Sequence, residues 1–595
     1  MKMKRNFLKT IQIISAVLLA ASCDLLDPYV KGTYNEENMT DYPKLVRGLI
    51  DHAYNIRPTT YNEAAYMGTD ALCDNAVVGS LSSNLRLYSL GNSSMSYNPV
   101  SSIWSDDYTA INYVNNFLKD DVGINTQYLL NREADLRLRS NLQGDAYALR
   151  AWYHFELLKY FGGVGVDGKL LGVPLLTEAS VVSDFDASAV KRAGFDETVA
   201  QILADCDSAY KYLPLSNRDY PGDPVYATPI CGSVRYTLFD QVSVDGLRAM
   251  VYLYWASPAF NPGGDMDRYK NAAVYAAKVM KHKLEKEGPL GFDPSQPFTW
   301  MDGNSPEAIF ASVAKSSSTY ETAFYPHNFG GSATYAPTQD LVDAFPMANG
   351  YPIDDPSNRG GYDPSKPYEG RDTRFYSTVF YNGSEVKRNG NGETMYTIES
   401  YKGGKDQPME EETSRSSYYT RKFIYLGWNK TDKTVLSNVT VMFFMRWEQM
   451  CLIFAEAANK YLNSATDATL GYSAKQALAY VRQRPTNDGG AGHATDPYLD
   501  ECAGSSTAFH ELVKNEWRIT TCFEGSRFFD LRRWGDNMNV DIHGAQITKN
   551  GDGSYSYNTT VLETRNLASP WFPIPVGETR KCRSLVQNAG YDNWK

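Results

Sequence analysis

The chain lacks most of the short motifs that would assign it a chemistry. Its seven histidines are scattered and none forms an i,i+4 pair, so the sequence contains no HExxH zinc motif. It also contains no GxSxG nucleophile elbow. These absences exclude the hydrolases that carry such motifs. They leave open a surface glycosidase, because the two carboxylates of a glycosidase meet in space and not in sequence.

Positive charge is in the minority. The sequence holds 58 Lys and Arg against 69 Asp and Glu, which gives a net charge of −11. Removal of residues 1–22, with four basic and no acidic residues, would make it −15. An acidic balance without a basic stripe argues against a nucleic-acid partner. It also argues against electrostatic attachment to a membrane surface.

Long apolar runs and a cysteine framework are missing as well. After residue 22 no uncharged apolar run approaches the roughly 20 residues that a membrane span needs. The eight cysteines include no CxxC pair and show no regular spacing. We expect most of the seven after Cys23 to act as small buried hydrophobes, with one disulfide pair left open.

Residues 1–22 are predicted to be a secretory signal peptide. A basic start, an apolar run at 11–21 and small residues before Cys23 form the usual three-part pattern, the basic residues being Lys2, Lys4, Arg5 and Lys9. The junction resembles the lipobox of bacterial lipoproteins, although Ala20 stands where Leu is favoured. Lipidation of Cys23 is therefore predicted; an ordinary signal peptide with a chance cysteine is the alternative.

Two glycine-rich motifs invite other interpretations. Residues 163–169 (GVGVDGK) nearly match both a dinucleotide-binding and a phosphate-binding loop, but they follow a helical pattern, and Leu170 stands where Ser or Thr would bind magnesium. We predict a turn. Residues 550–553 (NGDG) predict a hairpin turn more strongly than a calcium loop. No cofactor or metal site is predicted, and a structural calcium is left open.

Apolar residues with helical spacing dominate two parts of the chain. They predict helices at 142–160, 195–213, 247–256 and 269–280, and again at 441–462, 473–484, 506–518 and 527–534. Gly144, Ala148 and Ala151 are small enough to let another helix approach closely. Between the two parts, Gly, Pro, Asn, Asp and Ser predict loops with short strands, for instance at 308–313 and 378–381. No strict repeat period is visible, so helical repeats, if present, are degenerate.

This distribution of helix-forming and loop-forming residues divides the chain into six segments. They are a signal peptide (1–22), a lipidated tether (23–40), a helical-repeat scaffold in two parts (41–288 and 441–535), a loop-rich ligand-binding insert between them (289–440), and a loop-rich tail packed on the scaffold (536–595). Loops held on a rigid scaffold are where binding groups usually lie.

Several stretches, in order along nearly the whole mature chain, resemble the SusD/RagB family of outer-membrane lipoproteins. They are 23–27 (CDLLD), 144–155 (GDAYALRAWYHF) with 158–163 (LKYFGG), 354–362 (DDPSNRGGY) with 371–375 (RDTRF), 446–457 (RWEQMCLIFAEA), 516–518 (EWR) with 524–535 (EGSRFFDLRRWG), 572–575 (FPIP) and 587–591 (QNAGY). Thr373 replaces the proline usual in the family.

The resemblance implies a mainly α fold, with about four tetratricopeptide-like helix pairs and an irregular insert carrying short strands. It implies a lipid anchor through Cys23 in the outer membrane, exposure at the cell surface, and a SusC-like TonB-dependent β-barrel transporter as partner. Members capture glycans, and some capture peptides, and they are not enzymes. The charged residues of the motif at 524–535, notably Arg527 and Asp530, are expected to join Glu516 or Glu524 in a structural ion-pair network.

Aromatic residues are the candidate ligand contacts. The chain has 43 Tyr, 25 Phe and 10 Trp, and tyrosine suits surfaces that bind by stacking plus a hydroxyl hydrogen bond. Two loop stretches combine such rings with amide, imidazole or guanidinium groups. The predicted ligand-binding residues are Arg86, Tyr88, Asn92 and Tyr97 in the first, and Tyr320, Tyr325, His327, Asn328 and Tyr335 in the second. Simple packing is an equal alternative for each tyrosine.

The sequence therefore favours a surface protein that captures an oligosaccharide and passes it to its transporter without any catalytic residue. A peptide ligand in the same role is the main alternative. A surface glycosidase and a purely structural or adhesive role are the rivals from other classes.

Overall fold

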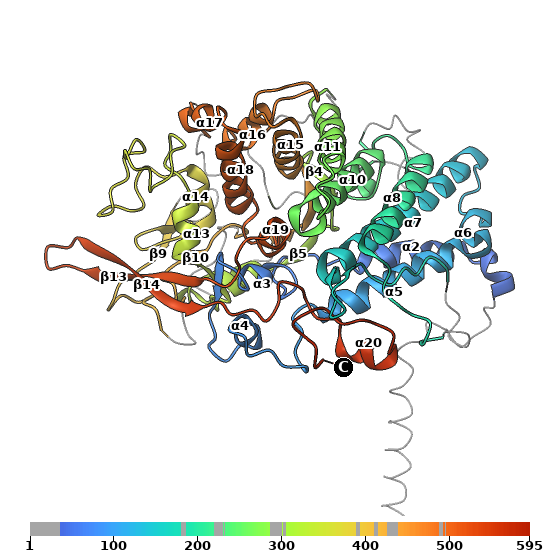
Figure 1. Ribbon diagram of the computed structural model, residues 1–595, viewed down its shortest axis with the longest axis horizontal. Helices are drawn as coiled ribbons and strands as arrows, with labels where there is room; N and C mark the ends of the chain where they lie inside the picture. Colours follow the sequence, from blue (N-terminus) through green and yellow to red (C-terminus); the bar gives the residue numbers. More distant parts are fainter. Residues whose placement is uncertain are drawn as a thin grey trace, which may run out of the picture.

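The computed structural model describes residues 36–179, 186–218, 230, 232–285, 300, 305–387, 393–409, 414–424, 438–486, 492–493 and 495–594. The predicted signal peptide and Cys23 lie outside these residues. Helices form an arc from the right of Figure 1 over its top, and small sheets and loops occupy the left and lower parts. The predicted fold class, a mainly helical scaffold with short strands, is confirmed.

The long helices follow one another around the arc. They are α2 (Pro43–Asn55), α5 (Ser101–Leu118), α7 (Arg132–Phe161), α8 (Phe195–Tyr212), α10 (Gln241–Ala256), α11 (Asp267–Glu285), α15 (Trp447–Leu462), α16 (Ala474–Arg482) and α18 (Ser506–Thr521). From α2 to α15 each helix packs on the next in this order, and α15 packs on both α16 and α18. The chain therefore builds its scaffold largely from neighbours in sequence, as helical repeats do.

Shorter helices connect or cap these elements. They are α3 (Met67–Asp70), α4 (Asn84–Ser89), α6 (Val122–Asn125), α12 (Thr319–Phe324), α13 (Gln339–Ala344), α14 (Thr373–Thr378), α17 (Pro497–Cys502), α19 (Arg527–Trp534) and α20 (Val576–Lys581), with 3-10 turns η1 (Glu36–Asp41), η2 (Lys119–Asp121), η4 (Ser233–Arg235), η5 (Pro258–Phe260) and η6 (His327–Phe329).

The described strands pair only two by two, always antiparallel. The pairs are β1 (Ala76–Val78) with β6 (Tyr335–Pro337), β2 (Gly163–Val164) with β3 (Leu170–Leu171), β4 (Ala308–Ala311) with β12 (Phe443–Arg446), β5 (Lys315–Ser317) with β11 (Asn438–Thr440), β7 (Val379–Phe380) with β10 (Tyr419–Thr420), β8 (Glu385–Lys387) with β9 (Thr394–Thr397), and β13 (Asp541–Lys549) with β14 (Tyr555–Thr564).

Helix α7 carries the family-like stretch 144–155, in which every residue except Tyr147 is buried. A Cβ atom on Gly144 would lie 2.5 Å from Cγ of Leu213, so only glycine allows α8 and its end to approach this closely. His154 in the same helix is fully buried, and burial lowers its pKa to about 4, so the ring stays neutral at physiological pH. The small-residue prediction for Gly144 is confirmed, and the motif serves packing.

The sequence predicted a helix at 441–462, and its first turn is wrong. Residues 443–446 are buried as strand β12, with Phe443 opposite Ala311 of β4, and the helix begins at Trp447. An apolar run of this length fits a buried strand as well as a helix, and pairing with the edge of β4 makes these residues a strand.

Six cysteines in the described part of the chain are free and buried.

Both glycine-rich motifs are turns, as predicted. Residues 165–169 join β2 to β3, and Asn550–Gly553 closes the β13–β14 hairpin, with the Gly553 amide donating to the Asn550 carbonyl at 3.0 Å. The hairpin corrects the loop-rich prediction for the tail, because its strands of nine and ten residues project from the body at the left of Figure 1. The tyrosine, threonine and valine residues of β14 favour this extended backbone.

Buried ion pairs join the second half of the scaffold. Glu456 accepts from both Nη atoms of Arg533, at 2.5 and 2.7 Å, and from Nε1 of Trp534 at 2.8 Å. Glu524 accepts from Arg446 and Lys422, while Glu516 accepts from Arg482 and Arg374.

The structural role predicted for this motif holds, but the predicted partners are wrong. Arg527 pairs with Asp74 at 2.8 Å, and Asp530 pairs with Arg533 at 2.8 Å. Glu516 and Glu524 bind other cations. Spacing along α19 could not reveal Asp74, which is more than 450 residues away in the chain.

Replacing Glu456 with glutamine is expected to lower the free energy of unfolding by about 3–5 kcal/mol, because Arg533 would remain buried without its main anion. Urea denaturation of the purified protein measures this change. Glu133→Gln is the matched control, since its pair with Arg137 is exposed and contributes less than about 1 kcal/mol. Equal effects of the two substitutions would contradict the assignment.

Candidate functional site

The two predicted ligand-binding stretches lie side by side. Strand β1 precedes the first stretch and β6 ends the second, and the two pair antiparallel with Val78 opposite Tyr335. The pairing continues one residue further, because the Gly79 amide donates to the Thr334 carbonyl at 3.1 Å. Strand pairing therefore brings together residues about 250 positions apart, which the sequence could not show.

In the first stretch, Arg86 and Tyr88 belong to the fold. Nε of Arg86 donates to Oε2 of Glu563 in β14 at 2.7 Å. Burial alone would raise the pKa of Glu563, but Arg565 and Arg415 outweigh it and hold that pKa below its usual range. Tyr88 is 3% exposed, and its hydroxyl hydrogen-bonds the hydroxyl of Tyr591.

In the second stretch, all three predicted tyrosines are buried. Tyr320 accepts a hydrogen bond from the Tyr61 amide at 2.9 Å and stacks on Phe423. Tyr325 is fully buried in a small core with Phe329 and Phe380. Tyr335 is 7% exposed. Because a ring must present a face to stack on a ligand, these three and Tyr88 serve packing in this structure, which corrects their assignment.

Four of the predicted residues do reach the surface. Asn92, His327 and Asn328 are exposed and Tyr97 is half-buried. Nδ2 of Asn328 donates to the Lys405 carbonyl, which fixes the turn η6 against its neighbour. Burial raises the pKa of Tyr335, and the negative charges that Tyr97 and Glu63 can carry raise it further. The outward candidates are therefore Asn92, Tyr97, His327 and Asn328.

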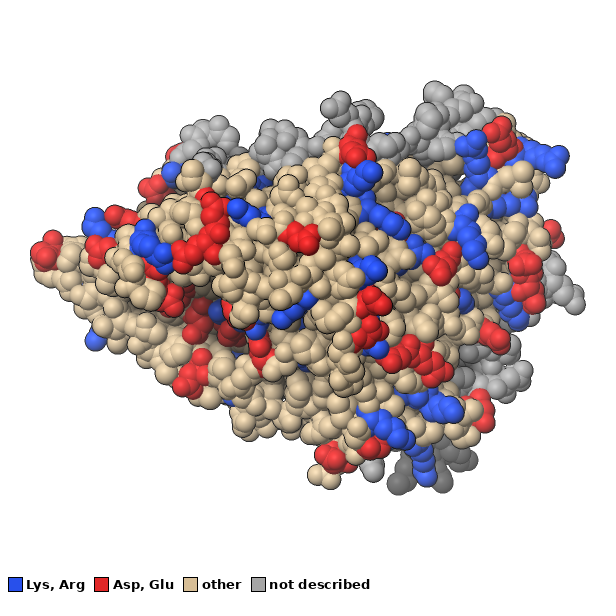
Figure 2. All heavy atoms as spheres, turned by 45° about the horizontal axis from the view of Figure 1, so that its top comes forward, with Lys and Arg blue, Asp and Glu red and all other residues tan. Residues whose placement is uncertain are grey.

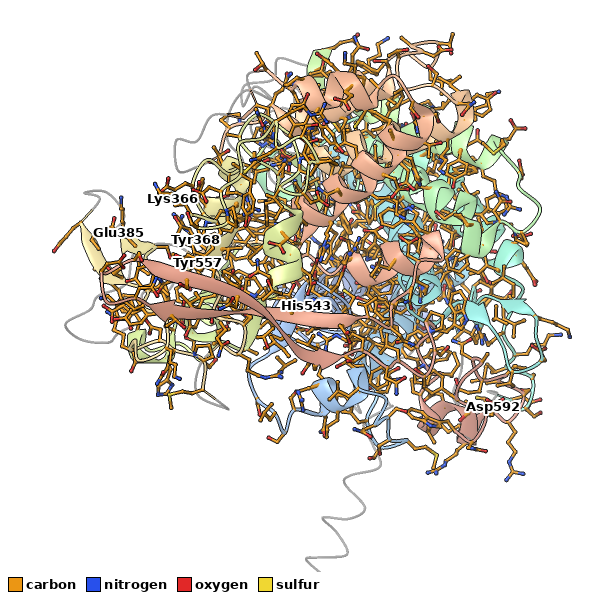
Figure 3. All side chains as sticks on the ribbon, turned by 60° about the vertical axis from the view of Figure 1, so that its left-hand side comes forward. Lys366, Tyr368, Glu385, His543, Tyr557 and Asp592 are labelled. Atoms are coloured by element: carbon orange, nitrogen blue, oxygen red, sulfur yellow. The ribbon has the colours of Figure 1, made fainter. Side chains whose placement is uncertain are left out.

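A second group of aromatic side chains was not among the predicted ligand-binding residues. Tyr368 and Tyr557 lie next to each other beside the hairpin in Figure 3, with ring centroids 5.3 Å apart, and Tyr381 lies 4.5 Å from Tyr368. Tyr381 and Tyr557 are half-exposed. The alternation of Tyr555 and Tyr557 in β14 places both rings on one face of the strand, and this pattern could have revealed them.

The charged groups near these surfaces are paired with one another. His543 on β13 (Figure 3) lies with Nδ1 2.7 Å from Oδ1 of Asp340, and its amide donates to Oδ2 at 2.8 Å. In the described part of the chain, no three His, Cys, Asp or Glu side chains are arranged to hold a metal ion. Acidic and basic residues are interspersed on the face in Figure 2, without a basic stripe.

No helix among the described residues is both long enough and apolar enough to cross a membrane. This agrees with the lack of long apolar runs after residue 22.

Solved structures with the same fold come from the Bacteroides group. A SusD-like protein from Bacteroides fragilis is 23% identical, with a TM-score of 0.69, covering 94% of this chain and 99% of that one. A SusD-like carbohydrate-binding protein from the same species is 18% identical (TM-score 0.66, 91% and 99% covered). Surface glycan-binding protein A from Bacteroides fluxus is 17% identical (TM-score 0.57, 92% and 99%). No curated protein matches the chain.

Two family models match the sequence itself. Residues 28–224 match the model described as starch-binding and associating with the outer membrane, and residues 306–591 match the model of the SusD family. They cover the α2–α8 part of the scaffold and the remainder from β4 to Tyr591. The chain belongs to the SusD/RagB family.

Proposed function

We propose that this protein binds an oligosaccharide at the cell surface and delivers it to a SusC-like TonB-dependent transporter in the outer membrane. The observation that carries the proposal is the set of outward groups on the two stretches, with Tyr97 half-buried and Asn92, His327 and Asn328 exposed. Sugar rings stack on aromatic faces, and their hydroxyls accept and donate hydrogen bonds with amides and imidazoles. The family match to starch-binding, outer-membrane-associated proteins supports a glycan over other ligands.

Binding without covalent chemistry is part of the proposal. Two carboxylates of the hairpin region, Glu563 and Asp340, are held by arginines and by His543. A glycosidase needs one free carboxylic acid and one free carboxylate on either side of the scissile bond. Incubation with polysaccharides should therefore release no new reducing ends.

The alternative ligand is a peptide. Tyr97 and the adjoining amide groups would bind a peptide backbone by the same contacts, so the chemistry of the surface permits it. A glycan array read beside a peptide library on the same purified protein separates the two ligand classes. An adhesive role without either ligand would give no soluble binding in both assays.

The double substitution Tyr97→Ala with His327→Ala is expected to weaken binding of the best array glycan by about tenfold or more, the equivalent of roughly 1.4 kcal/mol. Isothermal titration calorimetry measures the affinity. Tyr461→Ala, a half-buried tyrosine of α15 on the scaffold, is the control and should leave affinity unchanged.

Two further variants test the distinction between buried and outward tyrosines. Tyr88→Phe and Tyr325→Phe keep the buried rings and remove only their hydroxyls, so both should bind as the unchanged protein does. Loss of affinity in these variants, with Tyr97→Ala intact, would move the site to the buried rings.

Membrane attachment through Cys23 is a separate expectation. A Cys23→Ala variant should appear in the soluble fraction after cell lysis, because the thiol that carries the lipid is gone and one or two acyl chains supply the anchoring energy. Fractionation followed by immunoblotting measures this. Cys582→Ala, which removes a buried thiol at the other end of the chain, should stay with the membrane.

A further inference from the structure

A cavity of about 110 Å³ lies between the loop after α2, the start of α5 and the middle of α7. Four carboxylates from three separate segments line it: Glu63 from the loop, Asp106 and Asp107 from α5, and Glu156 from α7. Glu63 and Asp106 are exposed, whereas Asp107 and Glu156 are buried. Negative side chains therefore extend from its mouth to its interior.

Asp107 is the side chain that sets this cavity apart. It is 5% exposed, and its Oδ2 has no hydrogen-bond partner among the described residues. Burial raises the pKa of Asp107, and Glu156 and Asp106 raise it further, with only Lys159 acting in the other direction. Burial thus favours the protonated form of Asp107, and a cation bound beside its unbonded oxygen would stabilise the carboxylate form.

The basic side chains near these carboxylates, Arg57 in the cavity wall and Lys159 beside Glu156, are already engaged. Nε of Arg57 donates to the Tyr54 carbonyl at 2.9 Å and its Nη1 to the Ala311 carbonyl at 3.0 Å. Lys159 pairs with Oε1 of Glu156 at 2.5 Å and lies over the ring of Tyr160. Two held cations against four carboxylates leave the cavity with an excess of negative charge.

The remaining walls favour an organic cation over a bare ion. Tyr66, Trp152, Tyr153 and Phe444 line the same space. Aromatic faces attract ammonium and guanidinium groups within about 6 Å of the ring centroid. At roughly 30 Å³ per water, the volume corresponds to about four waters, which is more than one ion needs and enough for a small amine.

Tyr335 of the second predicted stretch lies close to one segment of the cavity wall. Its hydroxyl lies near Gly68, two residues after the lining residue Tyr66. The cavity and the surface are nevertheless distinct, since no residue of the predicted ligand-binding set lines the cavity.

We propose that this cavity is a binding site for a small organic cation bearing a primary ammonium group, with Asp107 as its main anion and the aromatic walls around its carbon atoms. Asp106 and Glu63 attract the cation to the mouth. The assignment does not depend on whether the protein captures a glycan or a peptide. It concerns side chains that the proposed ligand surface does not use.

The test is calorimetric titration of the purified protein with n-butylammonium chloride at fixed ionic strength, and with 1-butanol as the uncharged analogue of the same shape. We expect saturable binding of the ammonium ion and none of the alcohol. Asp107→Asn, which keeps the shape and removes the charge, should weaken ammonium binding by about tenfold to a hundredfold. Equal binding of ion and alcohol, or no binding of either, would overturn the site.

Controls keep the test independent of folding. Asp107→Asn should melt no lower than the unchanged protein without ligand, because a neutral amide is less costly to bury than an unpaired carboxylate. Asp106→Asn at the exposed mouth should weaken binding less, and Asp51→Asn, an exposed aspartate of α2, should leave it unchanged. If calcium chloride binds in a manner that Asp107→Asn abolishes while n-butylammonium does not, the site is a metal site and the proposal fails.

Discussion

The structure depends on the pairing of buried guanidinium and carboxylate groups. Taking a charge out of water costs several kcal/mol, and only a well-placed partner with further hydrogen bonds offsets that cost. Arg533 with Glu456 and Arg446 with Glu524 meet this condition, each through two bonds from the arginine. These contacts join α19, α15 and the end of α18, so the helices that close the scaffold are fixed by charge as well as by apolar packing.

The same constraint reaches the candidate site. Glu563 of β14 receives Arg86 from α4, Arg415 from the loop before β10, and Arg565. One buried carboxylate thus joins the projecting hairpin, the first predicted stretch and the middle of the chain. Together with the pairing of β1 and β6, it fixes the backbone next to both predicted stretches. Pre-organised groups bind with less loss of conformational entropy.

The sequence predicts the scaffold better than the site, for a physical reason. Helices such as α8 and α19 follow from the spacing of apolar residues, a local property that tertiary contacts reinforce. Residues 443–446 were assigned to a helix because a short apolar run fits a strand or a helix equally well. Only the pairing with β4 makes them a strand. The partner of Arg527, Asp74, escaped because ion pairs between distant segments leave no local signal.

Whether a tyrosine is buried or faces a ligand is the property that the sequence predicts least well. Its ring is apolar and its hydroxyl polar, so one side chain suits a core that offers a hydrogen bond or a surface that binds a ligand. Tyr88 and Tyr320 find a hydroxyl and an amide inside the protein, at Tyr591 and Tyr61, and Tyr97 is left half-exposed a few residues away. Composition and loop texture are the same for all three, and the partners exist only in the fold.

Asp107 differs from the paired carboxylates described above, because one of its oxygens has no hydrogen-bond partner among the described residues. Native proteins leave few buried polar atoms without a partner, and those exceptions concentrate where a ligand supplies the missing contact. In this protein Glu456 and Glu524, two carboxylates that support the scaffold, receive two or more donors each. Asp107 instead keeps an unbonded oxygen at a cavity lined by four aromatic side chains and three more carboxylates. The stability lost there is recovered when a cation enters, and a free energy of this kind, present only with ligand, is what distinguishes a binding site from a packing defect.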